Sequence, residues 1–464
     1  MRYLAPLVAA LVLSTSVTDA LAQKKPKKID CQKDLKKAVE LIDDMWSFKL
    51  FKPGSVDFNA VYEHLAPLAR GATTPEACYD VLARFMAQLR DGHSSVGFVP
   101  GLEYTRPEIE IRSQREKYTR IPNTPPPVHA YVVTRDTSDS TLREVIPGSE
   151  ILTVDGVGID SLYSYLAQRS SGSTDQWIDY MCDEDLLWGP ADTDVSLTLR
   201  TPGGQQRSLT VHRPAYKTEK EREQEHDTYE DTARIATWKR LESGWGYLKY
   251  TAFYFKSLDT TVARFDAGLQ ALFDAPGLII DLRGNGGGYI DAMSQVAGRF
   301  IEQRAVLQYI QERKPGQAEV YEFLDPITQK GTTRFPIIAD PRKPIYTGPV
   351  VILIDRRCFS ACEGFSGGLQ SIGRALVIGS ESSGGGSGAV GGLRLPSGAV
   401  ISFSHAVTWR PDGQQVEGNG VAPDIRVREL PRDWAAGKDR VLERAIEALE
   451  NGEAKPIQVT SGKT

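Results

Sequence analysis

The sequence contains few histidines and few cysteines, and it has no excess of positive charge. Its 464 residues include 6 histidines and 5 cysteines, and no cluster of His, Cys and Asp has the spacing of metal ligands. Lysine and arginine number 55 against 60 aspartates and glutamates, for a net charge of −5, so no basic stripe of a nucleic-acid-binding protein is expected. After the N-terminus, no apolar run approaches the roughly 18 residues that span a bilayer. We therefore expect no metal, no other cofactor, no nucleic-acid partner and no stable membrane insertion.

The apolar segment at the N-terminus has the features of a targeting signal. It carries Arg2, then an apolar run at residues 4–13, and it closes with Ala-Leu-Ala at residues 20–22. This pattern predicts a secretory signal peptide, residues 1–22, cut before Gln23, whereas the alternative is a buried N-terminal helix. No cysteine follows the cut, so a lipid anchor is not expected. The sequence therefore predicts an exported protein, periplasmic or secreted.

The cysteines are Cys31, Cys78, Cys182, Cys358 and Cys362. Export permits disulfides, and the odd count leaves at least one thiol without an intrachain partner. Cys31 and Cys78 both lie in the first helical part and could pair. Cys358 and Cys362 flank Ser360, and either could be a nucleophile in principle. Without a partner motif, their spacing favours small buried hydrophobic side chains.

Hydrophobic periodicity divides the first half of the chain into helical and strand-rich parts. Residues 23–95 show the apolar stripes of helices. Residues 96–124 are rich in proline and charge and are expected to form a connection. Residues 125–215 alternate between apolar and polar positions, as strands of a small β-rich insert do. Residues 216–238 carry dense charge and predict either a solvated linker or a surface helix.

The second half of the chain predicts an α/β fold class. Residues 239–432 contain continuous apolar strands, such as GLIIDLR and VVILID, that alternate with helical patterns. Such strands indicate a sheet that is covered on both faces. Residues 433–464 predict a C-terminal helix and a tail. The expected architecture is therefore an α/β core with a helical N-terminal region and the β-rich insert.

Ser360 lies where the strand VVILID gives way to a helical pattern. Glu363 follows three residues later, so the pair fits a capping box at a helix start. The same position faces unpaired N–H groups and the positive end of the helix dipole, which stabilise an oxyanion. Ser360 is therefore either a helix cap or a nucleophile, and the local pattern leaves both open.

A nucleophilic serine needs a base, and the histidines are the candidates. His93, in LRDGHSSVGF, lies on a glycine-hinged loop, where the alternative is a solvated side chain. His405, in ISFSHAVTW, is expected on a strand and is a weaker candidate. The others lie in helical, strand-rich or charged segments: His64, His129, His212 and His226.

Two further segments could complete a catalytic site. The glycines of DLRGNGGG, residues 281–288, could bring backbone N–H groups close to a substrate, or they could form only a tight turn. The segment lacks the pattern of a phosphate loop. Glu417, in EGNGVAPDIRV, could orient a histidine and stabilise its imidazolium form, or it could be a surface turn residue.

In their order along the chain, these segments resemble the S41 serine peptidases. The set is LRDGH, GLIIDLRGNGGG, FSACEGF, VIGSESSGGG, LRLPSGAVISF and VEGNGVAPDI. The family contains the tail-specific or C-terminal-processing proteases, the tricorn core and CPAF-like proteases. The resemblance covers residues 245–427 and the histidine loop, and it implies a ClpP/crotonase-like α/β core. The stretch GSEILTVDGVGI is similar to a PDZ domain, although no clear carboxylate-binding loop is present.

The family has two catalytic designs, and this sequence matches one of them. The first uses a serine–lysine dyad, but the glycine-rich region at residues 379–388 contains no lysine. The second, tricorn-like design takes its histidine from a D-G-H loop and its glutamate from an E-G-x-G-V-x-P-D motif. The resemblance therefore implies Ser360 as nucleophile, His93 as general base and Glu417 as its orienting partner. It also implies an oxyanion hole from the N–H groups near Gly286 or Gly287 and of Ala361.

The expected function is that of an exported serine endopeptidase, which would cut polypeptides through an acyl-enzyme. The alternative is a non-catalytic peptide-binding scaffold or chaperone that uses the same core and the PDZ-like insert. A weaker alternative is an esterase with the same triad. The sequence leaves open the natural substrate, the oligomeric state and whether the insert binds C-termini.

Overall fold

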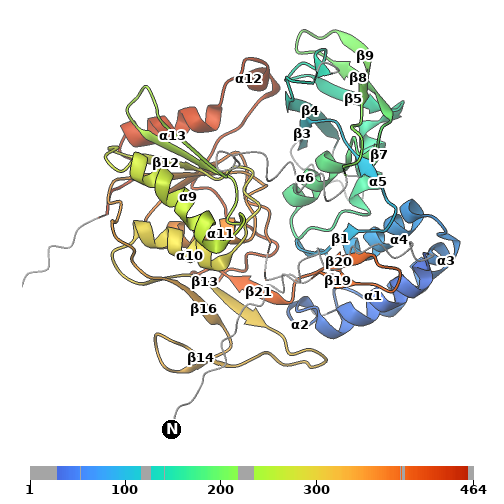
Figure 1. The fold of residues 1–464 in the computed structure, drawn as a ribbon, viewed down its shortest axis with the longest axis horizontal. Helices are drawn as coiled ribbons and strands as arrows, with labels where there is room; N and C mark the ends of the chain where they lie inside the picture. The colour runs from blue at the N-terminus through green and yellow to red at the C-terminus, as the bar shows by residue number, and fades with distance from the viewer. Residues whose placement is uncertain are drawn as a thin grey trace, which may run out of the picture.

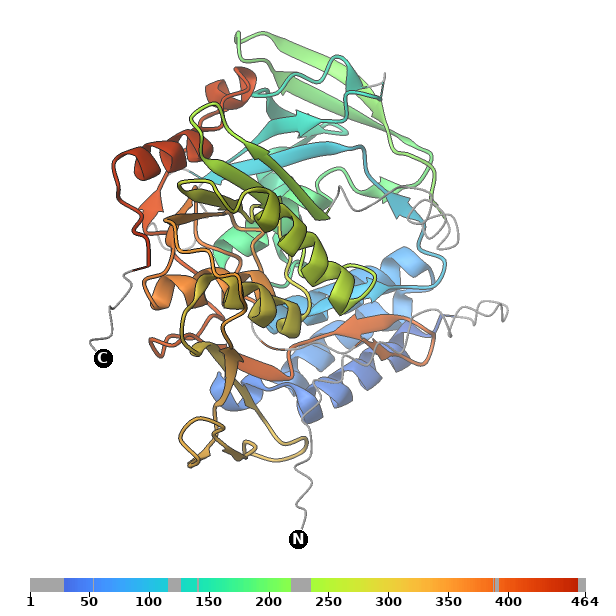
Figure 2. The ribbon, with the colours of Figure 1, turned by 60° about the vertical axis from the view of Figure 1, so that its left-hand side comes forward.

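The computed structural model describes residues 29–52, 54–115, 127–139, 142–217, 235–386, 388 and 392–457. The predicted signal peptide and most of the predicted charged linker lie outside the described residues. Figure 1 shows the N-terminal helices beside the β-rich insert, with the α/β core facing both. Figure 2 turns the molecule by 60° and shows that strands from late in the chain run along the N-terminal helices. Among the described residues, no helix has the length and apolar character that a membrane span requires.

The N-terminal part is helical, as its periodicity predicts. Its helices are α1 (Cys31–Met45), α2 (Phe48–Phe51), α3 (Phe58–Gly71) and α4 (Pro75–Gln88). The Thr74 hydroxyl caps α4 by accepting the N–H of Ala77 at 3.3 Å. A distant segment covers these helices: β20 (Val400–Ser402) pairs with β1 (Ser95–Phe98) and with β19 (Leu393–Arg394). This pairing places the loop between α4 and β1 at the boundary between the N-terminal part and the core.

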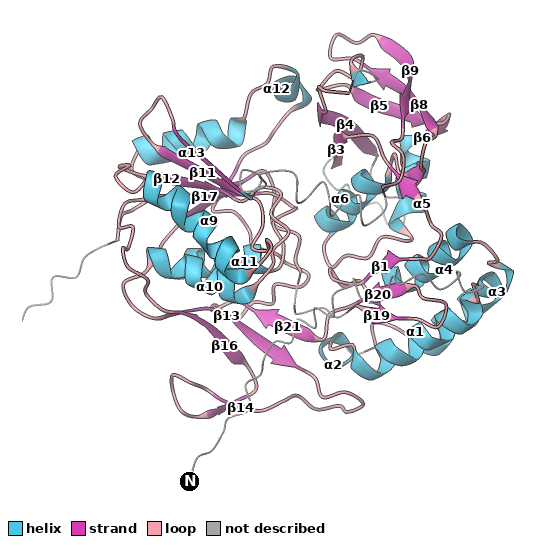
Figure 3. Cartoon of the chain, viewed as in Figure 1, coloured by secondary structure: helices cyan, strands magenta, loops and turns pink. Residues whose placement is uncertain are grey.

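The insert is a sheet with helices packed against it. The strand order is β3 (Ile109–Arg115), β4 (Val128–Arg135), β5 (Glu150–Val154), β8 (Asp194–Arg200) and β9 (Gln206–His212). β5 also forms a hairpin with β6 (Val157–Gly158). α5 (Ile159–Ala167) and α6 (Asp175–Asp185) complete the insert, and Figure 3 shows α6 on its side nearest the core.

The sequence prediction missed two elements of the insert. β3 lies within residues 96–124, which were expected to be a connection, and its alternate residues are buried against the insert core. The charged residues that lie between the buried positions of IEIRSQR mask this alternation. The second missed element is α6, whose sequence DQWIDYMCDED is mostly polar and buries only Cys182 and Asp183. Further short pairs are β2 (Tyr104–Thr105) with β7 (Gly189–Pro190), and β14 (Phe323–Leu324) with β15 (Gly331–Thr332).

Continuous apolar strands form a largely parallel sheet in the core. The order is β10 (Ala236–Arg240), β11 (Gly246–Tyr250), β12 (Leu278–Asp281), β17 (Val350–Ile354), β18 (Leu376–Gly379) and β22 (Ile425–Arg426). Every residue of β12 and β17 is buried, because helices cover both faces as predicted. On one face lie α9 (Leu258–Ala271), α10 (Ile290–Ala297), which continues into the 3₁₀ turn Gly298–Phe300, and α11 (Ala361–Ser371); α13 (Arg440–Glu450) lies on the other.

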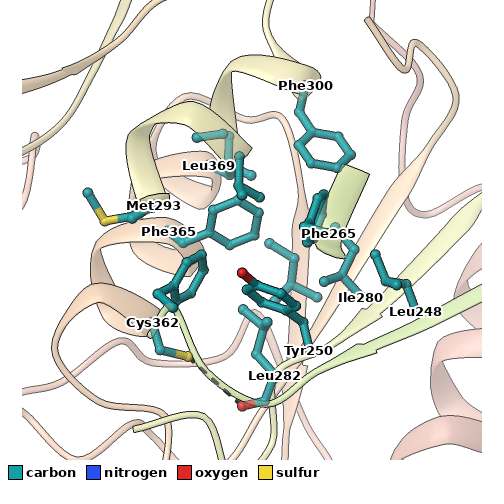
Figure 4. Close-up of a cluster of buried hydrophobic side chains, with 14 of the residues drawn as sticks. Leu248, Tyr250, Phe265, Ile280, Leu282, Met293, Phe300, Cys362, Phe365 and Leu369 are labelled. Atoms are coloured by element: carbon teal, nitrogen blue, oxygen red, sulfur yellow. Dashed lines mark hydrogen bonds between the residues drawn. The ribbon is translucent and has the colours of Figure 1, made fainter. Parts of the chain in front are cut away.

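The packing of α11 fixes the position of the residue before it. Figure 4 shows Phe365 and Leu369 of α11 buried with Phe265 of α9 and Tyr250 of β11. β12 and β17 are parallel neighbours, so residues 282–289 and 355–360 leave the sheet at the same edge. The N–H of Phe359 donates to the Asn285 carbonyl at 3.1 Å, which joins the two segments.

The remaining elements connect the core to the N-terminal part. A small sheet has the order β16 (Phe335–Ala339), β13 (Ala305–Glu312) and β21 (Ala406–Trp409). α12 (Pro431–Ala435) precedes α13 and packs on β4 of the insert. His405, which was expected on a strand, lies in a bend between β20 and β21.

Two disulfides are present among the described cysteines. Cys31 and Cys78 join α1 to α4, which is the pairing that the sequence left open. Cys358 and Cys362 form the second disulfide across Ser360, so the expectation that they are merely buried hydrophobic side chains is wrong. The first turn of α11 brings the two side chains together, which their sequence spacing alone does not reveal. Cys182 is a free, buried thiol.

We predict that the two disulfides differ in their contribution to stability. The loops that they close span 47 and 4 residues. The chain-entropy relation gives about 4 kcal/mol for the first and about 2 kcal/mol for the second. Urea unfolding of the Cys31→Ala/Cys78→Ala and Cys358→Ala/Cys362→Ala variants measures both. An equal loss of unfolding free energy in the two variants would contradict this prediction.

Candidate active site

Ser360 occupies a strained turn between β17 and α11. Its backbone has φ 56° and ψ −118°, a left-handed conformation that is uncommon for a residue with a Cβ atom. The N–H of Ser360 donates to the Glu363 carboxylate at 2.9 Å, as in a capping box. The N–H of Glu363 bonds to the backbone carbonyl of Ser360, also at 2.9 Å. Ser360 therefore stands at the N-terminus of a buried helix, where the surroundings hold its backbone in one conformation.

The glycine-rich turn lies directly against Ser360. A Cβ atom added to Gly287 would lie 2.9 Å from the Ser360 Cβ and 2.9 Å from the Ala361 nitrogen. Only glycine permits this approach, and the φ of Gly287 is also positive, at 96°. The N–H of Gly287 donates to the Asn285 side chain at 2.9 Å, whereas no hydrogen bond from the N–H of Gly286 or Ala361 is observed within the described part of the chain. Of the three residues predicted to form an oxyanion hole, Gly286 and Ala361 are therefore the better candidates.

His93 lies on the loop between α4 and β1 and faces the Ser360 turn. The centroid of its ring is 4.6 Å from the ring centroid of Phe359, the residue before Ser360. A Cβ atom on Gly92 would lie 2.9 Å from the Phe359 ring, so the glycine permits this approach. The histidine loop also contacts Glu417, the third residue of the predicted triad. The Gly92 N–H donates to Glu417 Oε1 at 3.3 Å.

Asp91 holds the histidine loop in place. Its buried carboxylate accepts the His93 N–H at 3.0 Å, the Ser94 hydroxyl at 2.8 Å and the Trp46 indole N–H at 3.1 Å. It also accepts the N–H and the hydroxyl of Ser404, at 2.9 and 2.7 Å. The sequence analysis did not assign a role to Asp91, although the D-G-H motif contains it. Its five donors come from segments far apart in sequence, which only the fold brings together.

Glu417 is buried, which contradicts the alternative of a surface turn residue. Its exposed fraction is 2%, and burial together with the nearby Asp91 carboxylate raises its pKa well above the ordinary range. Oε1 accepts the Gly92 N–H and the Lys52 ammonium, while Oε2 has no hydrogen-bond partner among the described residues.

Lys52 is a further residue of this site that the sequence analysis missed. Its Nζ lies 3.2 Å from Glu417 Oε1 and 3.0 Å from the Arg90 carbonyl. The ammonium also lies 4.4 Å from the centroid of the buried Phe48 ring. Lys52 follows α2 in FKLFKPG, which contains no recognisable motif, so only the fold reveals it. The positive charge opposes the effect of burial and favours the ionised form of Glu417.

Glu363 connects the Ser360 turn to the glycine-rich loop. Its buried carboxylate accepts the Ser360 N–H, the Ser383 hydroxyl, and the N–H groups of Gly385 and Gly386, both at 2.8 Å. Burial raises the pKa of Glu363 to about 7, against the lowering effect of these donors. The carboxylate thus fixes Ser360 and the loop that faces it with one set of hydrogen bonds.

The other histidines have different surroundings. His129 and His212 belong to the insert, where they pair with Glu150 at 2.7 Å and with Asp194 at 2.8 Å. His64 lies on α3, and His226 lies outside the described residues. Among the residues that the structure describes, no group of three His, Cys, Asp or Glu side chains could hold a metal ion. His93 is thus the histidine whose ring contacts the residue before Ser360.

Comparison with known families identifies the core. Residues 244–427 match the family described as Peptidase family S41, which confirms the resemblance that the sequence motifs indicate. The fold is similar to the structure of mature CPAF complexed with lactacystin, with a TM-score of 0.68 and 16% identity over 91% of this chain and 98% of that chain. The predicted S41 peptidase fold is therefore confirmed.

Several curated proteins share part of this sequence. A putative tricorn protease homolog 2 from Streptomyces coelicolor is 29% identical over 43% of this chain and 15% of its own length. The chloroplastic carboxyl-terminal-processing peptidase 1 of Arabidopsis thaliana is 26% identical over 67% of this chain and 53% of its own length. A carboxy-terminal-processing protease from Bartonella bacilliformis is 27% identical over 54% and 51%. The chain thus matches about half or less of the length of these relatives.

We predict that Lys52 stabilises the ionised Glu417. Replacing Lys52 by Met leaves a buried carboxylate without its cation, which costs about 1–3 kcal/mol of unfolding free energy. The loss should be greater at pH 9 than at pH 6, because Glu417 takes up a proton as the pH falls. Denaturant unfolding at both pH values measures this loss of unfolding free energy, with Lys49→Met as the control. Lys49 pairs with Asp43 at the surface, and its removal should change little. Identical behaviour of the two variants would contradict the role of Lys52.

The raised pKa of Glu363 predicts a pH-dependent stability. Because the folded-state pKa of about 7 exceeds the ordinary glutamate value of 4.5, the folded protein holds this proton more tightly than the unfolded chain. The stability contribution is complete below pH 4.5 and is lost as the pH rises through 7. The unfolding free energy of the wild type minus that of Glu363→Gln should therefore fall by roughly 3 kcal/mol between pH 4.5 and pH 8. A difference that is independent of pH would show that Glu363 titrates normally.

Proposed function

Because residues 244–427 form a peptidase family S41 core, we propose that this protein is a serine endopeptidase with Ser360 as its nucleophile. The observation that carries the proposal is the convergence of three segments on one turn. The His93 ring lies against Phe359, the backbone of Gly287 lies against Ser360, and Gly92 joins the histidine loop to Glu417. A helix cap requires none of these contacts, whereas a nucleophilic serine needs a base, a group that orients the base and backbone N–H donors close to it.

In the proposed reaction His93 takes the proton of the Ser360 hydroxyl as the oxygen attacks a peptide carbonyl carbon. The carbonyl oxygen becomes an oxyanion, which the N–H groups of Gly286 and Ala361 stabilise at the N-terminus of α11. The C–N bond then breaks, and His93 returns the proton to the leaving amine. Water, deprotonated by His93, hydrolyses the acyl-enzyme and restores the Ser360 hydroxyl.

Glu417 orients His93 in this proposal and stabilises the imidazolium that forms in each step. Its connection to the histidine loop runs through the Gly92 N–H, and the Lys52 ammonium favours its ionised form against the effect of burial. Gly287 permits the close approach of the glycine-rich turn, although its own N–H is bonded to Asn285. We therefore assign the oxyanion hole to Gly286 and Ala361 rather than to Gly287.

We further propose that the protein acts outside the cytoplasm. The signal peptide predicted at residues 1–22 supports export, and so do the two disulfides, since such bonds persist in oxidising compartments. The expected partner is a polypeptide substrate. The relatives named as C-terminal-processing proteases support this substrate class.

Proteolysis by the mature chain, Gln23 onward, tests the proposal. An unfolded protein and a peptide mixture serve as substrates at neutral pH with a chelator present, and mass spectrometry reads the cuts. Ser360→Ala should lower the rate by about 10³-fold or more. The control is Ser371→Ala, which removes a hydroxyl from the other end of α11 and should retain activity.

The outcome separates the proposed enzyme from the alternative scaffold. Cleavage by the wild type and by Ser371→Ala, but not by Ser360→Ala, supports the nucleophile. Equal peptide binding by all three proteins without cleavage would instead indicate a non-catalytic binding protein, and Ser360 would then be a helix cap.

A further inference from the structure

A short segment of the insert contacts three loops of the candidate active site. Ser171 donates to the carbonyl of Asp91 in the histidine loop at 2.9 Å. Ser173 and Thr174 donate to the carbonyls of Gly385 and Gly384 in the glycine-rich loop, at 2.5 and 2.6 Å. The Gly418 N–H, next to Glu417, donates to the Ser173 hydroxyl at 3.0 Å. Residues 171–174 thus bind three separate loops that the chain supplies from outside the insert.

Helix α6 extends the same contact to the Ser360 turn. Trp177 stacks on Phe359, with ring centroids 3.9 Å apart and an interplanar angle of 15°. The Gln176 amide donates to the Ser383 carbonyl at 2.9 Å. Because the Phe359 ring also contacts the His93 ring, movement of α6 would displace both the histidine and the serine turn.

The groove between β3 and α6 is the place where an edge strand of the insert could accept a peptide. β3 is the outer strand of its sheet, and a free strand edge binds extended peptides through its backbone N–H and C=O groups. Here, however, the Ser113 N–H of β3 donates to the Asp183 carboxylate of α6 at 3.0 Å. The edge is therefore blocked at Ser113 by a side chain of the insert itself.

Arg356 of the core enters the same groove. Its guanidinium donates to Asp183, and it also donates to the Ser113 hydroxyl at 3.3 Å. Both members of this ion pair are buried, each with an exposed fraction of 3%. Tyr163 donates a further hydrogen bond to Asp183. Removal of the arginine would leave a buried carboxylate without its counter-charge, which is strongly destabilising.

Arg356 belongs to the turn that carries Ser360. The segment between β17 and α11 is residues 355–360, and the next residue, Arg357, pairs with Glu110 of β3 at 2.8 Å. Two successive arginines of the turn are thus bound to the insert. Since the turn is short and its far end is Ser360, these ion pairs restrict where the serine can lie.

The space that remains beside the groove does not suit a peptide C-terminus with an apolar side chain. It is a cavity of about 790 Å³, and its described lining is entirely polar or charged. Arg115 pairs there with Asp179, and Arg112 pairs with Glu429. Two further lining residues, Arg426 and Arg428, show no ion pair within the described part of the chain. Because the described lining is polar or charged, the cavity offers no apolar pocket for the side chain of a C-terminal residue.

We propose that this chain's own Arg356 fills the groove between β3 and α6, so that the insert positions the Ser360 turn instead of binding the C-terminus of a substrate there. Arg356, Asp183 and Trp177 are positioning residues in this account. A test by enzyme kinetics rests on the proposed peptidase function, whereas a test by hydrogen exchange does not.

Kinetics with paired substrates test the proposal. An internally quenched peptide with a free C-terminal carboxylate and its C-terminal amide should give KM values within about two-fold of each other. Arg356→Gln and Asp183→Asn should each lower kcat by about 10-fold or more with little change in KM, because the serine turn is displaced. The double variant should be no worse than either single variant, since the pair acts as a unit.

Arg115→Gln is the matched control. Arg115 lies on the same strand and pairs with Asp179 of α6. Its replacement leaves the ion pair between Arg356 and Asp183 in place, so kcat should be retained. Hydrogen exchange of residues 355–361 gives a readout without catalysis. Exchange there should accelerate in Arg356→Gln and not in Arg115→Gln, while helices outside the turn exchange as in the wild type, which also shows that the variant is folded.

Two results would overturn the proposal. The first is a KM about ten-fold higher for the amidated peptide than for the free acid, with the difference abolished in Arg356→Gln, which would mean that the groove binds C-termini. The second is unchanged exchange of residues 355–361 in a folded Arg356→Gln variant. If the wild type cleaves nothing, the proposed function fails, but the exchange experiment still decides the role of the groove.

Discussion

The hydrogen bonds that the buried Glu363 carboxylate accepts are the interaction on which the candidate site depends. They hold the N–H of Ser360, whose positive φ is unfavourable for a residue with a side chain, and the N–H groups of Gly385 and Gly386 in the facing loop. The strain at Ser360 persists because the strand before it and the helix after it are both buried in the core. Because these contacts fix the turn, the Ser360 hydroxyl is held in one direction.

Three further buried carboxylates also join separate segments of the chain around the site. Asp91 organises the histidine loop, Glu417 joins that loop to the C-terminal part of the core, and Asp183 binds the arginine of the serine turn. Each carboxylate receives donors from segments that are distant in sequence, so each becomes stable only after the fold has formed. The price is desolvation, which raises the pKa of Glu363 to about 7 and the pKa of Glu417 well above its ordinary range. Neutral pH therefore lies close to the titration of Glu363, the carboxylate that holds the serine turn and the facing loop.

The sequence predicts the parts of the fold whose pattern is continuous. The apolar strands of the core and the helical stripes of residues 31–88 are confirmed, and the ordered motifs point to the S41 core. The sequence does not predict β3 and α6, because charged residues interrupt their apolar positions. It also cannot reveal Lys52, Asp183 or Arg356 as parts of the site, since their partners lie hundreds of residues away or on another element of the fold. The disulfide between Cys358 and Cys362 is hidden for a related reason, because only the turn at Ser360 brings the two thiols together.

Covalent labelling of Ser360 tests the central claim most directly. An alkyl fluorophosphonate forms a P–O bond with an activated serine as fluoride leaves, and the labelled position can be read by peptide sequencing in a mass spectrometer. We expect one adduct, on Ser360, and a rate at least about 100-fold lower in His93→Gln. A folded wild type that is labelled at other serines, or that reacts no faster than His93→Gln, would contradict the account of Ser360 as an activated nucleophile.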